Sequence, residues 1–167
     1  MRFIKLIFIS VIFLSLFLTA FSLLFPPHLH IARNVNIVSS EQKILSVISD
    51  LHTWNSWNKF ISDASLTNKT ISENGNILQS DQLQIFIKKD SSNSIEILWK
   101  QPNKKTFSGG FKLMEINPGT ITVQWYFDFT FKWYPWEKFS SLVYDKQLQP
   151  EIEESLTNLK QLVENNP

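Results

Sequence analysis

The stretch that decides the fold is residues 120–131, which read TITVQWYFDFTF. Every odd-numbered position in it is apolar, and the even-numbered positions are mostly polar. Because successive side chains of a β-strand point to opposite faces, this period of two predicts a strand with one buried and one solvated face. Such a half-solvated strand is typical of an antiparallel sheet. The apolar face consists of Ile121, Val123, Trp125, Phe127, Phe129 and Phe131.

Upstream of this strand, residues 65–119 show the same alternation, interrupted by turn signals. Residues 74–76 (Asn-Gly-Asn) and 117–119 (Asn-Pro-Gly) are combinations typical of tight turns. The glycine pair at 109–110 falls inside a strand pattern, where it favours a bulge or a sharp bend. Short strands joined by turns predict an antiparallel meander.

The segment before the meander combines one strand with short helices. Residues 28–38 alternate apolar and polar side chains, which predicts the first strand. Ser40 then suits a helix N-cap, and Glu41 suits the positive end of the helix dipole. Trp54, Trp57 and Phe60 recur at intervals of three, as on one face of a short helix. These rings form either a lid over the core or a pocket wall, and the two interpretations are compatible.

The C-terminal segment, residues 136–163, is amphipathic at helical spacing. Pro150 lies inside it and either kinks one helix or opens a second. A sheet with one apolar face must be covered, and this is the long helix available to cover it. The predicted fold class is therefore α+β, with a curved antiparallel sheet of about six or seven strands wrapped on a long C-terminal helix.

The N-terminus begins with an apolar run, residues 6–25, that contains no charged residue. As a helix, a run of this length spans about 30 Å, the thickness of a bilayer core. The alternative is a cleaved signal peptide, whose apolar region is usually about 7–15 residues. We expect residues 1–27 to be a retained membrane anchor and residues 28–167 to be one domain. Arg2 and Lys5 precede the run, which favours a cytoplasmic N-terminus and an exported domain in a single-pass protein.

The composition of the chain argues against several classes of function. Residues 28–167 carry 14 basic and 15 acidic groups, so the domain lacks the basic surface that nucleic acid requires. The absence of Cys excludes disulfides, thiolate metal sites and cysteine nucleophiles. Three His do not supply a zinc site, and Asp50 with His52 is better explained as a helix cap or a surface pair than as an acid–base pair. We expect no catalytic residues, no metal and no cofactor.

Three stretches together resemble the SRPBCC superfamily, which has the helix-grip fold of START lipid-transfer domains and plant pollen-allergen-like proteins. They are residues 30–37 leading into 40–51, residues 50–57 (DLHTWNSW), and residues 135–160. The pattern is most similar to the bacterial polyketide cyclase/dehydrase-like branch, in which a hydrophobic helix often precedes the first strand. The resemblance covers about residues 28–165. The glycine-rich early strands of that branch are missing, because the chain has four Gly.

The resemblance and the ring-rich inner face imply a binding module. A small apolar ligand, lipid- or isoprenoid-like, would lie between sheet and helix, held by burial of apolar surface. Two alternatives stay open: a non-catalytic envelope interaction protein with a filled core, and a cyclase- or dehydrase-type enzyme. Residues 132–136 (KWYPW) would be the partner contact of the first or would rest at the lipid interface. The residues expected to line the pocket are Trp54, Trp57, Trp99, Phe111, Trp125 and Phe127, with Trp54 and Trp57 near its mouth.

Overall fold

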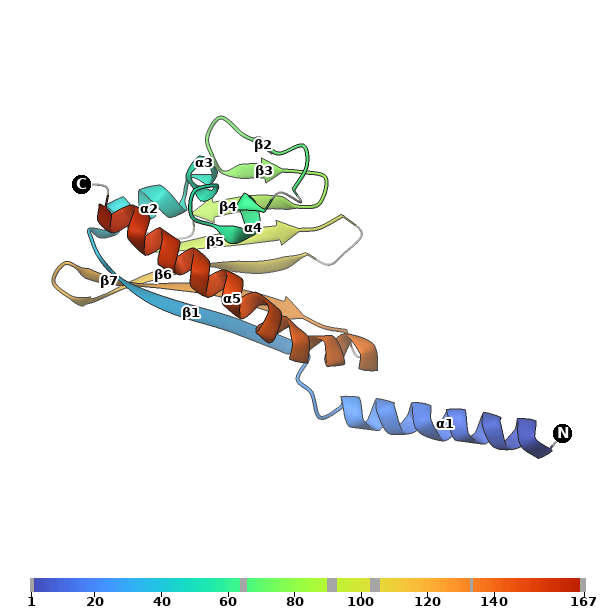
Figure 1. The fold of residues 1–167 in the computed structure, drawn as a ribbon. Helices are drawn as coiled ribbons and strands as arrows, with labels where there is room; N and C mark the ends of the chain where they lie inside the picture. Colours follow the sequence, from blue (N-terminus) through green and yellow to red (C-terminus); the bar gives the residue numbers. More distant parts are fainter. Residues whose placement is uncertain (1, 64–65, 90–92, 103–105, 133, 166–167) are drawn as a thin grey trace.

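The computed structural model describes residues 2–63, 66–89, 93–102, 106–132 and 134–165. Within them the strands are β1 (His28–Val38), β2 (Thr70–Ile71), β3 (Ile77–Gln79), β4 (Gln84–Lys89), β5 (Ser94–Lys100), β6 (Phe107–Asn117) and β7 (Thr120–Thr130). The helices are α1 (Arg2–Ser22), α2 (Glu41–Ile48), α3 (Leu51–Trp54), α4 (Lys59–Ser62) and α5 (Pro135–Asn165). The strands form one antiparallel sheet in the order β1-β7-β6-β5-β4-β3-β2, which confirms the predicted meander (Figure 1).

The alternation in β7 corresponds to its two environments. No odd-numbered residue from Ile121 to Phe131 is more than 8% exposed, whereas Asp128 and Thr130 face solvent. β7 pairs with β1 on one side and with β6 on the other, so its apolar face lies well inside the sheet. The predicted register is confirmed.

The glycine pair in β6 does not form a bulge, the first of the two features expected there. Gly109 and Gly110 pair in regular register with β7, and the register shift lies instead between Glu115 and Asn117. The glycines serve close approach: a Cβ on Gly110 would lie 2.1 Å from the carbonyl oxygen of Ile95. β6 therefore needs glycine at this position because a side chain would collide with β5, and not because an extra residue is inserted in the strand.

The short helices begin at side-chain caps. Ser40 Oγ accepts from the backbone N–H of Lys43 at the start of α2, as predicted. The Trp54–Phe60 run is not one helix, because α3 ends at Trp54 and α4 begins after Asn58. Asn58 Oδ1 accepts from the N–H of Phe60 at 3.0 Å, and this new cap separates the two helices.

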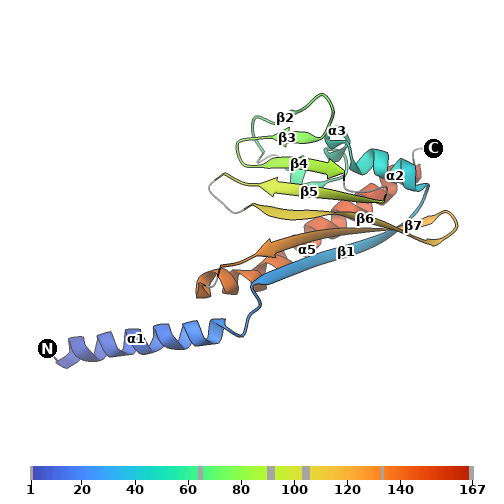
Figure 2. The ribbon, with the colours of Figure 1, turned by 180° about the vertical axis from the view of Figure 1, so that it is seen from behind.

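α5 is a single helix that contains Pro150, so the alternative of a second helix was wrong. Figures 1 and 2 show α5 crossing one face of the sheet, which gives the predicted helix-grip arrangement. Arg33 of β1 reaches α5, with its Nη2 3.1 Å from Asp145 and its Nε 3.4 Å from Glu153. The helix face that packs on the sheet includes Ile152, Leu156, Leu159 and Val163, all buried.

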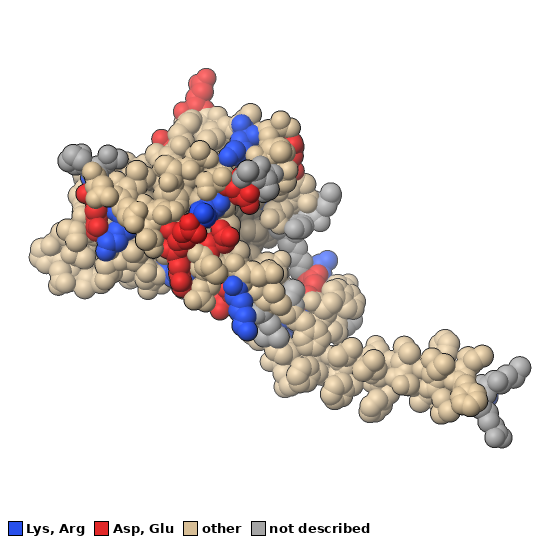
Figure 3. All heavy atoms as spheres, viewed as in Figure 1, with Lys and Arg blue, Asp and Glu red and all other residues tan. Residues whose placement is uncertain are grey.

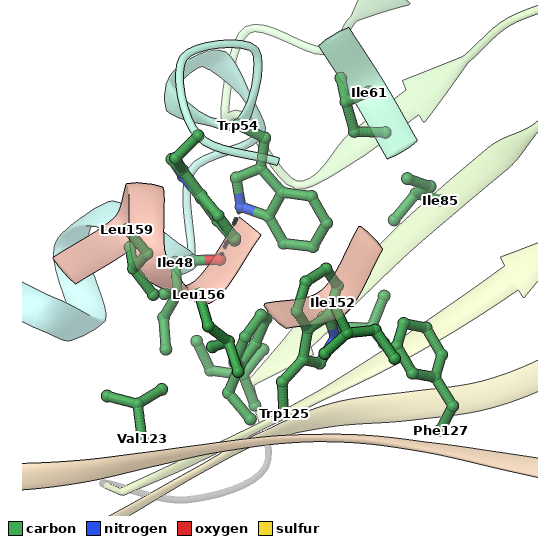
Figure 4. Packing of buried hydrophobic residues seen from close by; sticks show 14 of the residues in the cluster. Ile48, Trp54, Ile61, Ile85, Val123, Trp125, Phe127, Ile152, Leu156 and Leu159 are labelled. Carbon is green, nitrogen blue, oxygen red and sulfur yellow. Dashed lines mark hydrogen bonds between the residues drawn. The ribbon is translucent and has the colours of Figure 1, made fainter. Parts of the chain in front are cut away.

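Rings fill the space between α5, α3 and the sheet (Figure 4). We call Trp54, Trp57, Phe111 and Trp125 the aromatic core; none is more than 1% exposed, and neighbouring ring centroids lie 5.0–6.5 Å apart. Trp54 Nε1 donates to the carbonyl oxygen of Ile48 at 3.0 Å, which fixes the orientation of that ring. This part of the interior is solidly packed.

α1 extends away from the rest of the chain, with exposed apolar side chains along its length (Figures 1 and 3). Among the described residues it is the one helix long and apolar enough to cross a membrane. Its last turn and the following segment contact the start of α5, where the Phe139 ring lies 6.2 Å from Phe21 and 5.6 Å from Phe25. The backbone N–H of Phe131 donates to the carbonyl oxygen of Pro27 at 2.8 Å. α1 therefore meets the sheet and α5 at one shared end.

Candidate functional site

A pocket of about 490 Å³ lies between α5 and the end of the sheet where β5 and β7 finish and β6 begins. Its deep wall is buried and apolar, while Gln82, Thr106 and Thr130 are exposed, so the pocket opens to the surface. The lining consists of Phe60, Leu66, Gln82, Leu83, Trp99, Gln101, Thr106, Phe107, Phe127, Phe129, Thr130, Phe131, Glu137, Tyr144 and Leu148.

One wall of the pocket is aromatic, and its β7 residues follow from the alternation of side chains along that strand. The inward face of β7 continues from the aromatic core to Phe127, Phe129 and Phe131, which all reach the pocket. Phe107 of β6 stacks on Trp99 of β5, with centroids 5.9 Å apart and planes at 7°, and lies 4.8 Å from Phe129. Ring-to-ring packing stiffens this wall and keeps it apolar.

The opposite wall of the pocket comes from α5, whose lining residues recur at helical spacing. Glu137, Tyr144 and Leu148 of α5 are seven and four residues apart, so they form one stripe on the helix. Tyr144 also contacts the Phe129 ring, with centroids 5.2 Å apart. The first half of α5 thus closes the pocket, while its second half packs on the aromatic core.

α4 contributes Phe60 and is held on α5 by two contacts of Lys59. The backbone N–H of Lys59 donates to the buried Ser155 Oγ at 2.9 Å. Its Nζ lies 2.9 Å from Glu154 Oε1, and the hydrogen bond to that carboxylate raises the pKa of Lys59. Phe60 is thereby set edge-on against the rings of Trp99 and Phe127, at 6.2 and 6.0 Å.

The six residues expected to line a pocket divide into two groups. Trp99 and Phe127 line the pocket. Trp54, Trp57, Phe111 and Trp125 form the aromatic core beside it, with Phe60 between the groups. The lining also includes Phe107, Phe129, Phe131, Tyr144 and Leu148, which were not proposed; strand parity alone indicates Phe129 and Phe131 as inward-facing.

The polar groups of the site lie toward its rim. In the described lining, Glu137 is the one carboxylate, and its Oε2 accepts from the backbone N–H of Lys132 at 2.7 Å. Asp50 and His52 are elsewhere: Asp50 caps α3, and its Oδ1 lies 2.7 Å from His52 Nδ1 on the surface. Within the described ranges, no group of three or more His, Cys, Asp or Glu side chains could hold a metal ion. The arrangement suits retention of an apolar molecule.

A seven-stranded antiparallel sheet gripping one long C-terminal helix defines the helix-grip fold of START-type and SRPBCC-type proteins. Solved structures confirm this fold: a START superfamily protein from Mycobacterium smegmatis superposes with a TM-score of 0.61 at 16% identity, covering 83% of this chain and 99% of that one. Zhui aromatase/cyclase from a Streptomyces species gives 0.61 at 12% identity, covering 83% and 94%.

Norcoclaurine synthase from Thalictrum flavum also superposes, with a TM-score of 0.61 at 9% identity, covering 84% of this chain and 88% of that one. No family sequence model and no curated protein matches the chain. Identities this low establish the fold and leave the function to be argued from the pocket.

Proposed function

We propose that this chain is a membrane-tethered binding domain that holds a small apolar ligand, lipid- or isoprenoid-like, between its sheet and α5. The observation that carries the proposal is the pocket of about 490 Å³ with buried rings on one side and the Tyr144–Leu148 stripe on the other. Its size falls in the range of about 300–1,000 Å³ typical of small-molecule sites. Each Å² of apolar ligand surface buried there contributes about 25 cal/mol.

Two further observations support the proposal. The Thalictrum flavum norcoclaurine synthase structure, which shares the fold, is a complex with dopamine and hydroxybenzaldehyde, so a helix-grip protein can bind small ring-containing molecules. α1 supports the tether, because it is long and apolar enough to cross a membrane and is exposed along its length. The basic residues at its start favour a cytoplasmic N-terminus, with the domain on the opposite side.

The interaction-protein alternative is favoured by one observation: Trp136 is 69% exposed at the start of α5. Trp133, part of the same run, lies outside the described residues. The enzyme alternative has less support, because Glu137 has no acidic or histidine neighbour in the described lining. Binding of an apolar ligand accounts for the apolar lining of the whole pocket, whereas neither alternative does, so we favour ligand binding.

The test is recovery of a ligand with the full chain. The protein is extracted from membranes in mild detergent and washed, and the small molecules released by denaturation are identified by mass spectrometry. Leu148→Trp fills the pocket from α5, whereas Leu98→Trp makes the same substitution on the outer face of β5, where Leu98 is 43% exposed. We expect one class of apolar molecule with the wild type and Leu98→Trp, and none with Leu148→Trp.

Recovery of the same molecule from all three proteins would place it outside the pocket and contradict the proposal. So would the absence of any bound molecule, combined with no saturable tryptophan quenching by fatty acids, isoprenoids or sterols. The second result would favour the interaction-protein alternative. Circular dichroism of both variants controls for folding.

A further inference from the structure

The pocket opens at the same end of the domain at which α1 joins it. The rim residue Thr130 ends β7, and Phe131, the next residue, lines the pocket and bonds through its N–H to Pro27. Glu137, also in the lining, is two residues from Phe139, whose ring contacts Phe21 and Phe25. Figures 1 and 2 both show α1 leaving the domain where β7 ends and α5 begins.

An aromatic and basic patch lies in the stretch of chain between Phe131, which lines the pocket, and Phe139, whose ring contacts Phe21 at the end of α1. We define it by Lys132, Tyr134 and Trp136. Tyr134 and Trp136 stack with centroids 5.0 Å apart and planes at 5°, and Lys132 Nζ lies 6.0 Å from the Tyr134 ring. Trp136 is three residues before Phe139, so the two lie on neighbouring positions of one side of α5. Trp136 therefore lies within one helical turn of the residue that contacts α1.

The composition of the patch fits a lipid surface. Tryptophan and tyrosine concentrate at the headgroup level of membranes, and lysine can extend its charge to the same level. A stacked ring pair with Trp136 69% exposed would leave apolar area in water if no partner covered it. Leu23 and Leu24, which join α1 to the domain, are 72% and 75% exposed and add apolar surface at the end of α1 that is attached to the domain.

We infer that Lys132, Tyr134 and Trp136 rest on the membrane that α1 crosses, with the pocket rim against the lipid headgroups. The ligand then passes between the bilayer and the pocket without crossing bulk water. This inference rests on the proposed function, but its first half, the position of the rim, can be tested without any ligand.

The test uses single cysteines, since the native chain has none. Thr130→Cys, at the rim, is labelled with an environment-sensitive fluorophore in the full chain, reconstituted into phosphatidylcholine vesicles that carry a nitroxide quencher near the headgroup. Glu115→Cys, exposed in β6 at the other end of the strand, is the matched control site. We expect quenching at position 130 and none at position 115.

A second comparison tests the patch itself. In the Thr130→Cys background, Tyr134→Ser with Trp136→Ser should weaken the quenching, because the rim is then held near the headgroups only by the contacts that tie it to α1, those of Phe139 with Phe21 and Phe25 and the bond from Phe131 to Pro27. Met114→Ser with Ile116→Ser removes two exposed apolar side chains at the far end, 47% and 57% exposed, and should leave the quenching unchanged. Absence of quenching at position 130 in the otherwise native chain, or quenching that removal of the patch leaves unchanged, would overturn the inference.

Ligand recovery separates this inference from the proposed function. If a ligand is recovered and blocked by Leu148→Trp but position 130 is not quenched, the inference fails and the binding function stands. If position 130 is quenched in a patch-dependent way but no ligand is bound, the binding function fails and the patch remains a membrane contact.

Discussion

Substitution of Trp125, at the centre of β7, tests which face of that strand is buried. Trp125 is fully buried, and its ring stacks on Phe111 with centroids 5.0 Å apart. Trp125→Asp removes that packing and buries a charge without a partner, so we expect a loss of at least about 4 kcal/mol. Because domains of this kind are stable by about 5–15 kcal/mol, the variant should be largely unfolded in thermal melts followed by circular dichroism.

Asp128 is the matched control on the opposite face of β7. Its Oδ1 lies 2.6 Å from His30 Nδ1, and both side chains are about half exposed, at 48% and 56%. Exposed pairs contribute about 0–1 kcal/mol, so Asp128→Asn should change the melting temperature little. The reverse ranking of the two variants would mean that β7 is shifted by one residue.

Gly110 in β6 and Gly119 in the turn between β6 and β7 differ in what a methyl group would meet. At Gly110 it would lie 2.1 Å from the backbone oxygen of Ile95, whereas at Gly119 it meets open space but the backbone has φ of +81°. Gly110→Ala forces β5 and β6 apart and should cost about 3 kcal/mol. Gly119→Ala incurs only the left-handed penalty of about 1–2 kcal/mol. Urea unfolding midpoints measure both; a larger loss at Gly119 would contradict the close approach.

At the scale of elements, the hydroxyl of Ser155 makes one of the two contacts of Lys59 that hold α4 on α5. Ser155 Oγ accepts from the N–H of Lys59 and donates to the carbonyl oxygen of Glu151 at 2.6 Å. Ser155→Ala leaves the Lys59 N–H without this partner and should destabilise the protein by about 1–3 kcal/mol. Thr157→Ala removes a similar bond, to Glu153, on the exposed side of α5, and should change stability by less than about 0.5 kcal/mol. Equal losses in urea unfolding would show that the α4 contact contributes nothing.

Most elements could be predicted because their signals are local. β1 spans His28–Val38 as the alternation indicates, β7 follows the odd–even pattern, and α2 begins at its serine cap. The bulge expected as one alternative at the glycine pair in β6 was wrong, because the glycine signal is the same for a bulge and for a close approach to a neighbouring strand. Only the strand pairing distinguishes the two.

The site was less predictable from the sequence, because its position depends on which aromatic rings pack against one another and which ones border the pocket. Trp125 and Phe127 are on the same face of β7, yet the first packs in the aromatic core and the second reaches the pocket. The difference follows from their neighbours: the rings of Trp54 and Trp57 pack against Trp125, whereas Phe127 borders the pocket under the first half of α5. Tyr144 and Leu148 could not be placed, because helical spacing does not say which strand they face.

At the scale of the whole molecule, retention of α1 decides whether the domain is tethered. The helix has 21 residues and is followed by exposed leucines at 23 and 24, longer than a usual signal region. We expect the mature protein to keep it, so that intact mass spectrometry of the membrane fraction gives the full-length mass. A mature protein that begins near Leu23 would contradict the tether and would also remove the Phe21 contact with Phe139.

The segment between α1 and β1, residues 23–27, limits how far the domain can travel. Five extended residues reach roughly 17 Å, less than the length of the 11-residue strands β1, β6 and β7, and the Pro27 to Phe131 bond shortens the reach further. If the proposed function holds, the domain therefore encounters its ligand by lateral diffusion in the membrane. It meets molecules in the adjacent leaflet and does not reach molecules in the aqueous phase away from the membrane. Any protein that hands over or collects the ligand must come to the same membrane, and its encounter rate depends on density per unit of membrane area.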